Sequence, residues 1–331
     1  MCVESGMLEY KSACSILSFR NNAGTWKNAR IYAYSPRPGH RPSPWMREFL
    51  ARHDVEHIAL DLNTRLPDYP LANKPVCMAH AEEVLTDATL VFLDGDTLCW
   101  NPPNGLALPD SADLMLWPDS TKTVASCGAG DPYDPMWLKL YQIAGAAFEP
   151  WTTTQLTGVR VRGWWSSGVV VARRSSGLMR AWRETLFRAI EENIFPQEAT
   201  YLREQLSLCG VAATTDRIAL LSVGCNYPVQ NWDHYTRQDG IAPESAEIWH
   251  YQEFLNRAFR RFAEQMAAAP SLDSRISTTN AFLAHVKSHY KSCVGRDEPI
   301  QKALRRRLRL GIRLRRLLGI PRDTDTQAAD F

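Results

Sequence analysis

The chain has 331 residues, of which 45% are hydrophobic and 22% are charged, and its formal net charge at pH 7 is +2. This composition is typical of a globular protein that buries a large core in one or two domains. A net charge so close to zero argues against binding of nucleic acid by the whole molecule. No apolar run approaches the roughly 18 residues that a membrane-spanning helix needs, so we do not expect an integral membrane protein.

The cysteines are scattered singly, without a Cys-x-x-Cys pair or the His/Cys spacing of a zinc site. The N-terminus also lacks the pattern of a signal peptide. Disulfides are rare in reducing compartments, where cysteine serves as a small core residue. On these grounds we expect a cytoplasmic protein.

The N-terminal part of the chain alternates predicted strands and helices. Residues 1–4 resemble the tail of a strand, and Asn73-Lys74-Pro75 opens a helix. The hydrophobic periodicity predicts helices at 6–19, 45–52 and 73–84, and strands at 30–34, 57–62 and 90–93. Such alternation implies right-handed crossovers and a mainly parallel sheet.

The strand at 90–93 ends in Asp94-Gly95-Asp96. Ligands of α/β proteins collect outside the carboxyl ends of strands, so both carboxylates are placed to bind one hard cation. Gly95 would allow the backbone to pass close to a ligand. The alternative is an ordinary turn, because Asp and Gly favour turns through local hydrogen bonds and their accessible φ values.

The pattern loosens at 101–160, where Gly, Pro and aromatic residues predict loops with short helices. The aromatic side chains there either stack on a ligand or pack in the core. Further on, the small residues Ser166-Ser167-Gly168 leave room for a ligand to approach the backbone. The periodicity of the remaining chain predicts strands at 169–172, 218–221 and 248–251, and helices at 178–190 and 196–208.

The C-terminal part, 253–331, is predicted to be a helical extension of a domain at 1–252. Helical patterns cover 253–268 and 279–293, and the tail at 302–320 carries arginines on one side of a helix and leucines on the other. Such a tail either binds an anionic membrane surface or docks its leucines on the protein. The first alternative would attach the protein peripherally to the inner face of the membrane.

Several short motifs occur in an order that resembles a known family. They are Asn73-Lys74-Pro75, Leu93-Asp94-Gly95-Asp96-Thr97, Ser166-Ser167-Gly168-Val169-Val170, Pro196-Gln197-Glu198, Asn226-Tyr227-Pro228 and Ile248-Trp249-His250-Tyr251. Together they resemble nucleotide-sugar glycosyltransferases of the GT-A fold, in particular the glycogenin and bacterial lipopolysaccharide galactosyltransferase-like group. The resemblance implies an α/β, Rossmann-like fold with a mixed, mostly parallel sheet flanked by helices.

The same resemblance implies a metal-dependent enzyme that moves a sugar from a nucleotide-sugar, expected to be a UDP-sugar, to a glycan or glycolipid acceptor. In the family an Asp-x-Asp pair and a late histidine hold Mn²⁺ or Mg²⁺ against the donor diphosphate, and these roles fall here to Asp94, Asp96 and His250. Mixed oxygen and nitrogen ligation favours Mn²⁺. The resemblance also implies that the transfer retains the anomeric configuration.

Lys74 matches a basic residue that contacts the donor in relatives, and the alternative is a solvated lysine at a helix start. Relatives carry Asn-Ser-Gly where this chain has Ser166-Ser167-Gly168, and Asp-Gln where it has Pro196-Gln197. In relatives both positions line the donor sugar or the face where the reaction takes place, so the departures concern which sugar is bound and which residue acts at the reacting carbon. By resemblance, we assign Gln197 and Asp96 to catalysis, and Lys74, Asn73, Asp94, Ser167 and Gly168 to donor binding.

Two other functions fit part of the pattern. The run from Leu93 to Leu98 resembles the strand end of haloacid-dehalogenase-type phosphatases, but Thr97 comes one position too early for that chemistry. A non-catalytic protein that binds a nucleotide-sugar or scaffolds a membrane complex is the second alternative, because fold resemblance does not establish activity. The intact set of Asp94, Asp96 and His250 favours retained metal binding.

Overall fold

The computed structural model describes residues 1–251 of the chain. The helical extension predicted for 253–331, with its basic tail at 302–320, lies outside the described residues. Within residues 1–251, no helix has both the length and the apolar character that crossing a bilayer requires. The described part is a mixed α/β domain, as the sequence predicts.

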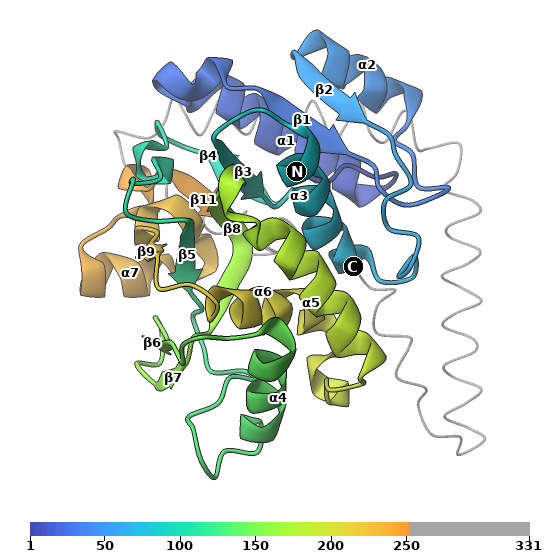
Figure 1. The fold of residues 1–331 in the computed structure, drawn as a ribbon. Coiled ribbons are helices and arrows are strands. Elements are labelled where there is room, and N and C mark those ends of the chain that lie inside the picture. The colour runs from blue at the N-terminus through green and yellow to red at the C-terminus, as the bar shows by residue number, and fades with distance from the viewer. Residues whose placement is uncertain (252–331) are drawn as a thin grey trace, which may run out of the picture. The chain divides into compact units, whose positions relative to one another are not determined.

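A four-stranded sheet in the order β3-β8-β5-β9 forms the centre of this domain (Figure 1). Its strands are β3 (Thr89–Leu93), β8 (Trp165–Arg173), β5 (Leu114–Pro118) and β9 (Ile218–Leu220). β8 is antiparallel to both β3 and β5, whereas β5 and β9 are parallel. The β-branched run Val169-Val170-Val171 in β8 is completely buried, as its continuous apolar character predicts.

The described residues also form three smaller sheets. The first pairs β1 (Ile31–Tyr34) with β2 (Val55–Ile58), the second joins β10 (Tyr227–Pro228), β11 (Ile248–His250) and β4 (Thr97–Cys99), and the third pairs β6 (Trp151–Thr153) with β7 (Arg160–Arg162). β1 and β2 are parallel, and Cys2 forms a parallel bridge with Tyr34. The bridge confirms that residues 1–4 contain the tail of a strand.

Helices pack against the central sheet and against one another (Figure 1). They are α3 (Asn73–Val84), α4 (Asp134–Ala144), α5 (Leu178–Glu191) and α6 (Arg203–Ala212). α3 contacts α5, α5 contacts α6, and α6 contacts both α4 and β8. Apolar side chains such as Trp182 and Leu206 join Phe92 of the sheet in one buried core, and this burial is the main stabilising term of the domain.

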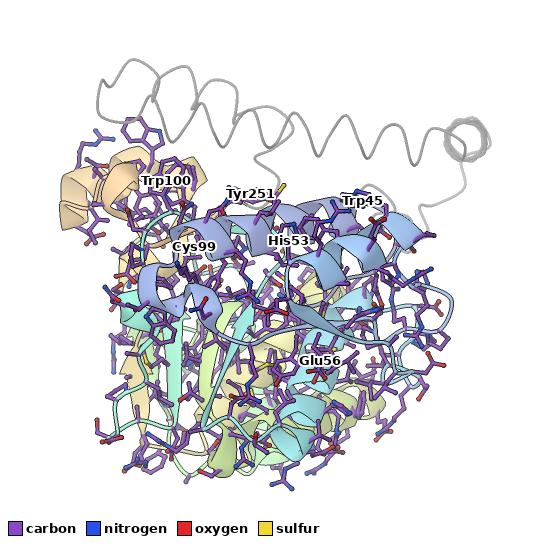
Figure 2. The ribbon with its side chains drawn as sticks, turned by 90° about the horizontal axis from the view of Figure 1, so that it is seen from above. Trp45, His53, Glu56, Cys99, Trp100 and Tyr251 are labelled. Atoms are coloured by element: carbon purple, nitrogen blue, oxygen red, sulfur yellow. The ribbon has the colours of Figure 1, made fainter. Side chains whose placement is uncertain are left out.

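Another pair of helices, α1 (Met7–Asn22) and α2 (Pro44–Arg52), lies side by side in Figure 2. α1 contacts β4 and α2 contacts β2. α2 begins as its sequence predicts, because Ser43 Oγ accepts a hydrogen bond from Met46 N at 3.2 Å and Pro44 stands in the first turn. The short helix α7 (Trp232–Asp239) completes the described α-helices.

Several features differ from the sequence prediction. β8 runs antiparallel to both of its neighbours, although the alternation of strands and helices predicts mainly parallel pairing. The strand predicted at 57–62 is β2 at Val55–Ile58. β5 is an inner strand of the central sheet, although it lies in the segment 101–160 that is predicted as loops. Its apolar run is short and ends at Pro118, so the turn-forming residues around it dominate the pattern. The helix predicted at 196–208 begins as a 3₁₀ segment, Gln197–Leu202, and α6 starts at Arg203.

Strand pairing brings the candidate functional residues together. Leu93 pairs with Val169, so the end of β3 lies beside the middle of β8, next to Gly168. Thr97 pairs with His250, which places the end of β11 next to the turn that follows β3. These contacts join segments that are far apart in the sequence.

Candidate active site

Asp94 and Asp96 occupy a hydrogen-bonded turn between β3 and β4. Asp94 N donates to Gly168 O at 2.9 Å, and Thr97 donates to Asp94 O from both its backbone N at 3.2 Å and its Oγ1 at 2.7 Å. The side chains of the two aspartates remain 19% and 18% exposed. The motif is thus a turn, and this turn presents both carboxylates at the end of a strand.

His250 lies opposite Asp96, with its Nε2 3.3 Å from Asp96 Oδ1. One ligand atom from each of Asp94, Asp96 and His250 can be chosen so that all lie within 4.8 Å of one another. Two carboxylate oxygens and one imidazole nitrogen form a donor set suited to Mn²⁺, and with added waters to Mg²⁺. The three residues predicted as metal ligands are therefore brought together.

Gly168 provides the space for the imidazole of His250. A Cβ atom at position 168 would lie 2.3 Å from Cε1 and 2.7 Å from Nδ1 of that ring. The room that the sequence assigns to an approaching ligand is thus filled by His250. The absence of a side chain at Gly168 therefore allows the imidazole of His250 to lie where it does.

Lys74 is buried and lies among acidic groups at the N-terminus of α3. Its Nζ is 2.8 Å from Asp94 Oδ2 and 3.2 Å from Glu204 Oε1, and it donates to Ser167 Oγ at 3.2 Å. Burial alone would lower the pKa of Lys74, but the two carboxylates raise it overall. The alternative of a solvated lysine is wrong, because the side chain is 11% exposed.

Glu204 also lies beside Lys74 and Ser167, although the sequence pattern does not predict it. Its Oε1 accepts hydrogen bonds from Lys74 Nζ and from Ser167 Oγ, the latter at 3.0 Å. Its Oε2 is buried and has no hydrogen-bond partner among the described residues. A buried carboxylate oxygen without a partner is costly.

Gln205 follows Glu204 and is also buried. Its Nε2 donates to Asp119 Oδ2 at 2.7 Å, and burial raises the pKa of that aspartate. Glu204 and Gln205 form a buried acid–amide pair that lies outside the Pro196-Gln197-Glu198 motif.

The structure places two predicted residues away from the carboxylates of the turn. Gln197 is exposed at the start of the 3₁₀ segment, where its carbonyl accepts from Thr200 Oγ1 at 2.9 Å. Asn73 is buried, and its Oδ1 accepts from Asn63 Nδ2 at 2.9 Å. No hydrogen bond described for either side chain reaches Asp94 or Asp96.

Helix α1 covers the turn at Gly95. A Cβ atom at Gly95 would lie 2.9 Å from Leu8 Cδ1 and 3.1 Å from Ser12 Oγ, so the backbone there is close to the helix and not to open space. Lys11 of α1 places its Nζ 3.4 Å from Asp96 Oδ2. Figure 2 shows Cys99, two residues beyond Thr97, beside this helix.

The neighbouring charges have different effects on the two aspartates. Burial raises the pKa of Asp94 in spite of the opposing charge of Lys74. Burial would also raise the pKa of Asp96, but the hydrogen bond and charge of His250 and the charge of Lys11 lower it overall. Burial lowers the pKa of His250 and contact with Asp96 raises it, with a net increase.

Residues 1–216 match the family described as the Rhodobacterales glycosyltransferase domain. The chain therefore belongs to this glycosyltransferase family. The assignment confirms the resemblance to glycosyltransferases and favours this function over a phosphatase. Comparison with curated proteins gives no match.

Solved structures of glycosyltransferases are similar to this chain at low sequence identity. The galactosyltransferase LgtC, in complex with donor and acceptor sugar analogues, has 14% identity and a TM-score of 0.47 over 80% of this chain and 92% of its own. GlyE of Streptococcus pneumoniae has 14% identity and a TM-score of 0.44, and the bifunctional WbbM has 13% and 0.43. The matches cover 76% and 74% of this chain, but 53% of GlyE and 44% of WbbM.

Proposed function

We propose that this glycosyltransferase takes its sugar from a nucleotide-sugar, with UDP as the expected nucleotide, and transfers it to a glycan or glycolipid acceptor. The observation that carries the proposal is the cluster of Asp94, Asp96 and His250 at the end of β3. We propose these residues as ligands of Mn²⁺ or Mg²⁺. A divalent cation held there would offset the charge of the diphosphate leaving group.

Lys74 and Lys11 are proposed to contact the donor diphosphate. Each ammonium group lies beside a carboxylate of the turn, at 2.8 Å from Asp94 and 3.4 Å from Asp96 respectively. If these carboxylates held a cation, they would bind both lysines less tightly, while Glu204 would still pair with Lys74. Lysine suits this role because its charge is carried on a flexible stem.

Glu204 and Ser167 are proposed to contact the donor sugar. The observation that supports this role is the buried Oε2 of Glu204, which has no hydrogen-bond partner in the described part of the chain. A sugar hydroxyl that donates to this oxygen would remove the cost of leaving it unpaired. Asn73 holds the neighbouring loop through Asn63 and is proposed to shape this side of the donor site.

The reacting face is proposed to contain Gln205. This residue is buried beside Glu204 and bonded to Asp119, whereas Gln197 is exposed. The sequence predicts Gln197 for this face, and that assignment stays a prediction beside the proposal of Gln205. Retention of the anomeric configuration is expected from the family resemblance, and NMR of the product anomer tests it.

A thermal-shift panel of nucleotide diphosphates and nucleotide-sugars, each with and without Mn²⁺, tests the proposal. A ligand that binds the native state raises the unfolding midpoint. We expect a Mn²⁺-dependent shift with one nucleotide in the wild type and in the exposed control Asp110→Ala, but none in Asp96→Ala. A shift without Mn²⁺, or a full shift in Asp96→Ala, contradicts the metal site.

A second measurement on the same samples distinguishes an enzyme from a non-catalytic protein that only binds the nucleotide-sugar. Release of free nucleotide from the stabilising nucleotide-sugar, by hydrolysis or transfer, is expected for an enzyme. A Mn²⁺-dependent shift without any release of nucleotide over long incubation with a range of acceptors supports a binding protein instead.

A further inference from the structure

We infer that Asn226 positions His250 by fixing the proton of the neutral imidazole on Nδ1, so that the lone pair of Nε2 faces the metal site. The inference rests on the proposed metal site, because it concerns the orientation of one of its ligands. Asn226 is a positioning residue in this scheme, since it acts through His250 and has no contact with the cation.

The contact that carries the inference is a buried hydrogen bond. Asn226 Oδ1 lies 2.9 Å from His250 Nδ1, and the two residues are 2% and 7% exposed. An amide oxygen only accepts hydrogen bonds, so Nδ1 must supply the proton. The ring therefore carries a proton on Nδ1. Without a cation, Nε2 faces the carboxylate of Asp96 and carries a proton as well, and a cation held there would take the place of that second proton.

Other contacts hold the amide in this orientation. Asn226 Nδ2 donates to Ser166 Oγ at 3.2 Å, and the same oxygen accepts from Gly168 N at 3.3 Å. Ser166 belongs to β8, so the central sheet fixes the amide on the side away from His250. Asn226 is thereby anchored at both of its polar atoms.

The backbone keeps Asn226 and His250 in register. Asn226 ends the 3₁₀ segment Val223–Asn226, directly before β10, whose Pro228 pairs with His250 in β11. Glu247 N also donates to Gly224 O at 2.8 Å. These contacts hold the two segments in register, and Gly168 lies against the ring of His250.

The chemical consequence concerns the side of the ring that faces Asp96. Nε2 lies 3.3 Å from Asp96 Oδ1, within the group of atoms that could hold a cation. A neutral ring with its proton on Nε2 would direct an N–H group into this space and could not bind a metal. Partners that fix the tautomer of a metal-binding histidine typically change metal affinity about 10- to 100-fold when they are removed.

Affinity for Mn²⁺ alone, measured by EPR of the free ion with full-length protein, tests the inference. We expect Asn226→Ala to weaken binding by about 10- to 100-fold. Asn226→Asp should stay within a few-fold of the wild type, because a carboxylate also accepts from Nδ1. The matched control is Asn22→Ala, which removes another side-chain amide, bonded to Cys99 O.

The tautomer is observed directly by ¹⁵N NMR of labelled histidine in the wild type, before and after addition of Mg²⁺. We expect Nδ1 to keep its proton and Nε2 to lose its proton when Mg²⁺ binds. Loss of the proton from Nδ1, or a proton kept on Nε2 in the Mg²⁺-bound protein, overturns the inference, even if Asn226→Ala fails to fold. Unchanged Mn²⁺ affinity in a folded Asn226→Ala protein also overturns it, whereas absence of Mn²⁺ binding by the wild type removes the metal site itself.

Discussion

At the scale of single residues, the candidate site is a set of charges that offset one another. Lys74 lies between Asp94 and Glu204, and Asp96 lies between Lys11 and His250. Buried carboxylates without such partners would be costly. The site can therefore keep its geometry before a donor binds, which is the condition for a pre-organised site.

Gly168→Ala tests the support of His250 at this scale. The added methyl group would overlap the imidazole, so the ring must move away from Asp96. We expect Mn²⁺ affinity, measured by EPR, to fall by about tenfold or more, because the nitrogen ligand is displaced. Gly224→Ala is the matched control, since a Cβ there meets no atom nearer than 3.7 Å. Equal affinity of the two variants contradicts the account of Gly168.

At the scale of elements, α1 and α6 supply what the short motifs do not contain. α1 covers the turn at Gly95 and contributes Lys11, and α6 contributes Glu204 and Gln205.

Elsewhere, a buried ion pair joins β7 to α4. Arg162 Nε lies 2.7 Å from Asp134 Oδ1, and the two side chains are 6% and 9% exposed.

The ion pair predicts a pH-dependent contribution to stability. The hydrogen bond from Arg162 lowers the pKa of Asp134 below its usual value. The pair therefore stabilises the fold above the unfolded pKa of about 4, and this contribution is lost as pH falls through the lower folded pKa. We expect Asp134→Asn to lower the free energy of unfolding by about 1.5–3 kcal/mol at neutral pH, and by less in acid.

Urea unfolding at neutral and acidic pH measures this difference. Asp110→Asn, which changes an exposed aspartate, is the control and should have little effect at either pH. A loss in Asp134→Asn that is the same at both pH values contradicts the assigned role of the pair.

At the scale of the whole molecule, the sequence predicts the α/β class and the turn at Asp94 and Asp96 with His250 opposite it. The turn follows from a local pattern, an apolar strand that ends in two acids, whereas the place of His250 is implied by the resemblance to glycosyltransferases. β5 is missed because turn-forming residues surround its short apolar run. Glu204 is not predicted because a single acidic residue in a helix gives no signal of function. It joins the candidate site only because β8 and α3 pack beside α6 in the folded chain.

The antiparallel direction of β8 is also absent from the local pattern, because its valine run fits either direction. The basic helix at 302–320 and its binding to an anionic membrane surface stay predictions from the sequence.

The central claim is that Asp94, Asp96 and His250 bind a divalent cation against a nucleotide diphosphate. Calorimetric titration of full-length protein with UDP, with and without Mn²⁺, tests it most directly. We predict binding that requires Mn²⁺ and that weakens on the order of 10- to 100-fold in His250→Ala, but not in the control His53→Ala at the end of α2 (Figure 2). UDP binding that is independent of Mn²⁺, or equally tight in His250→Ala, would contradict the account.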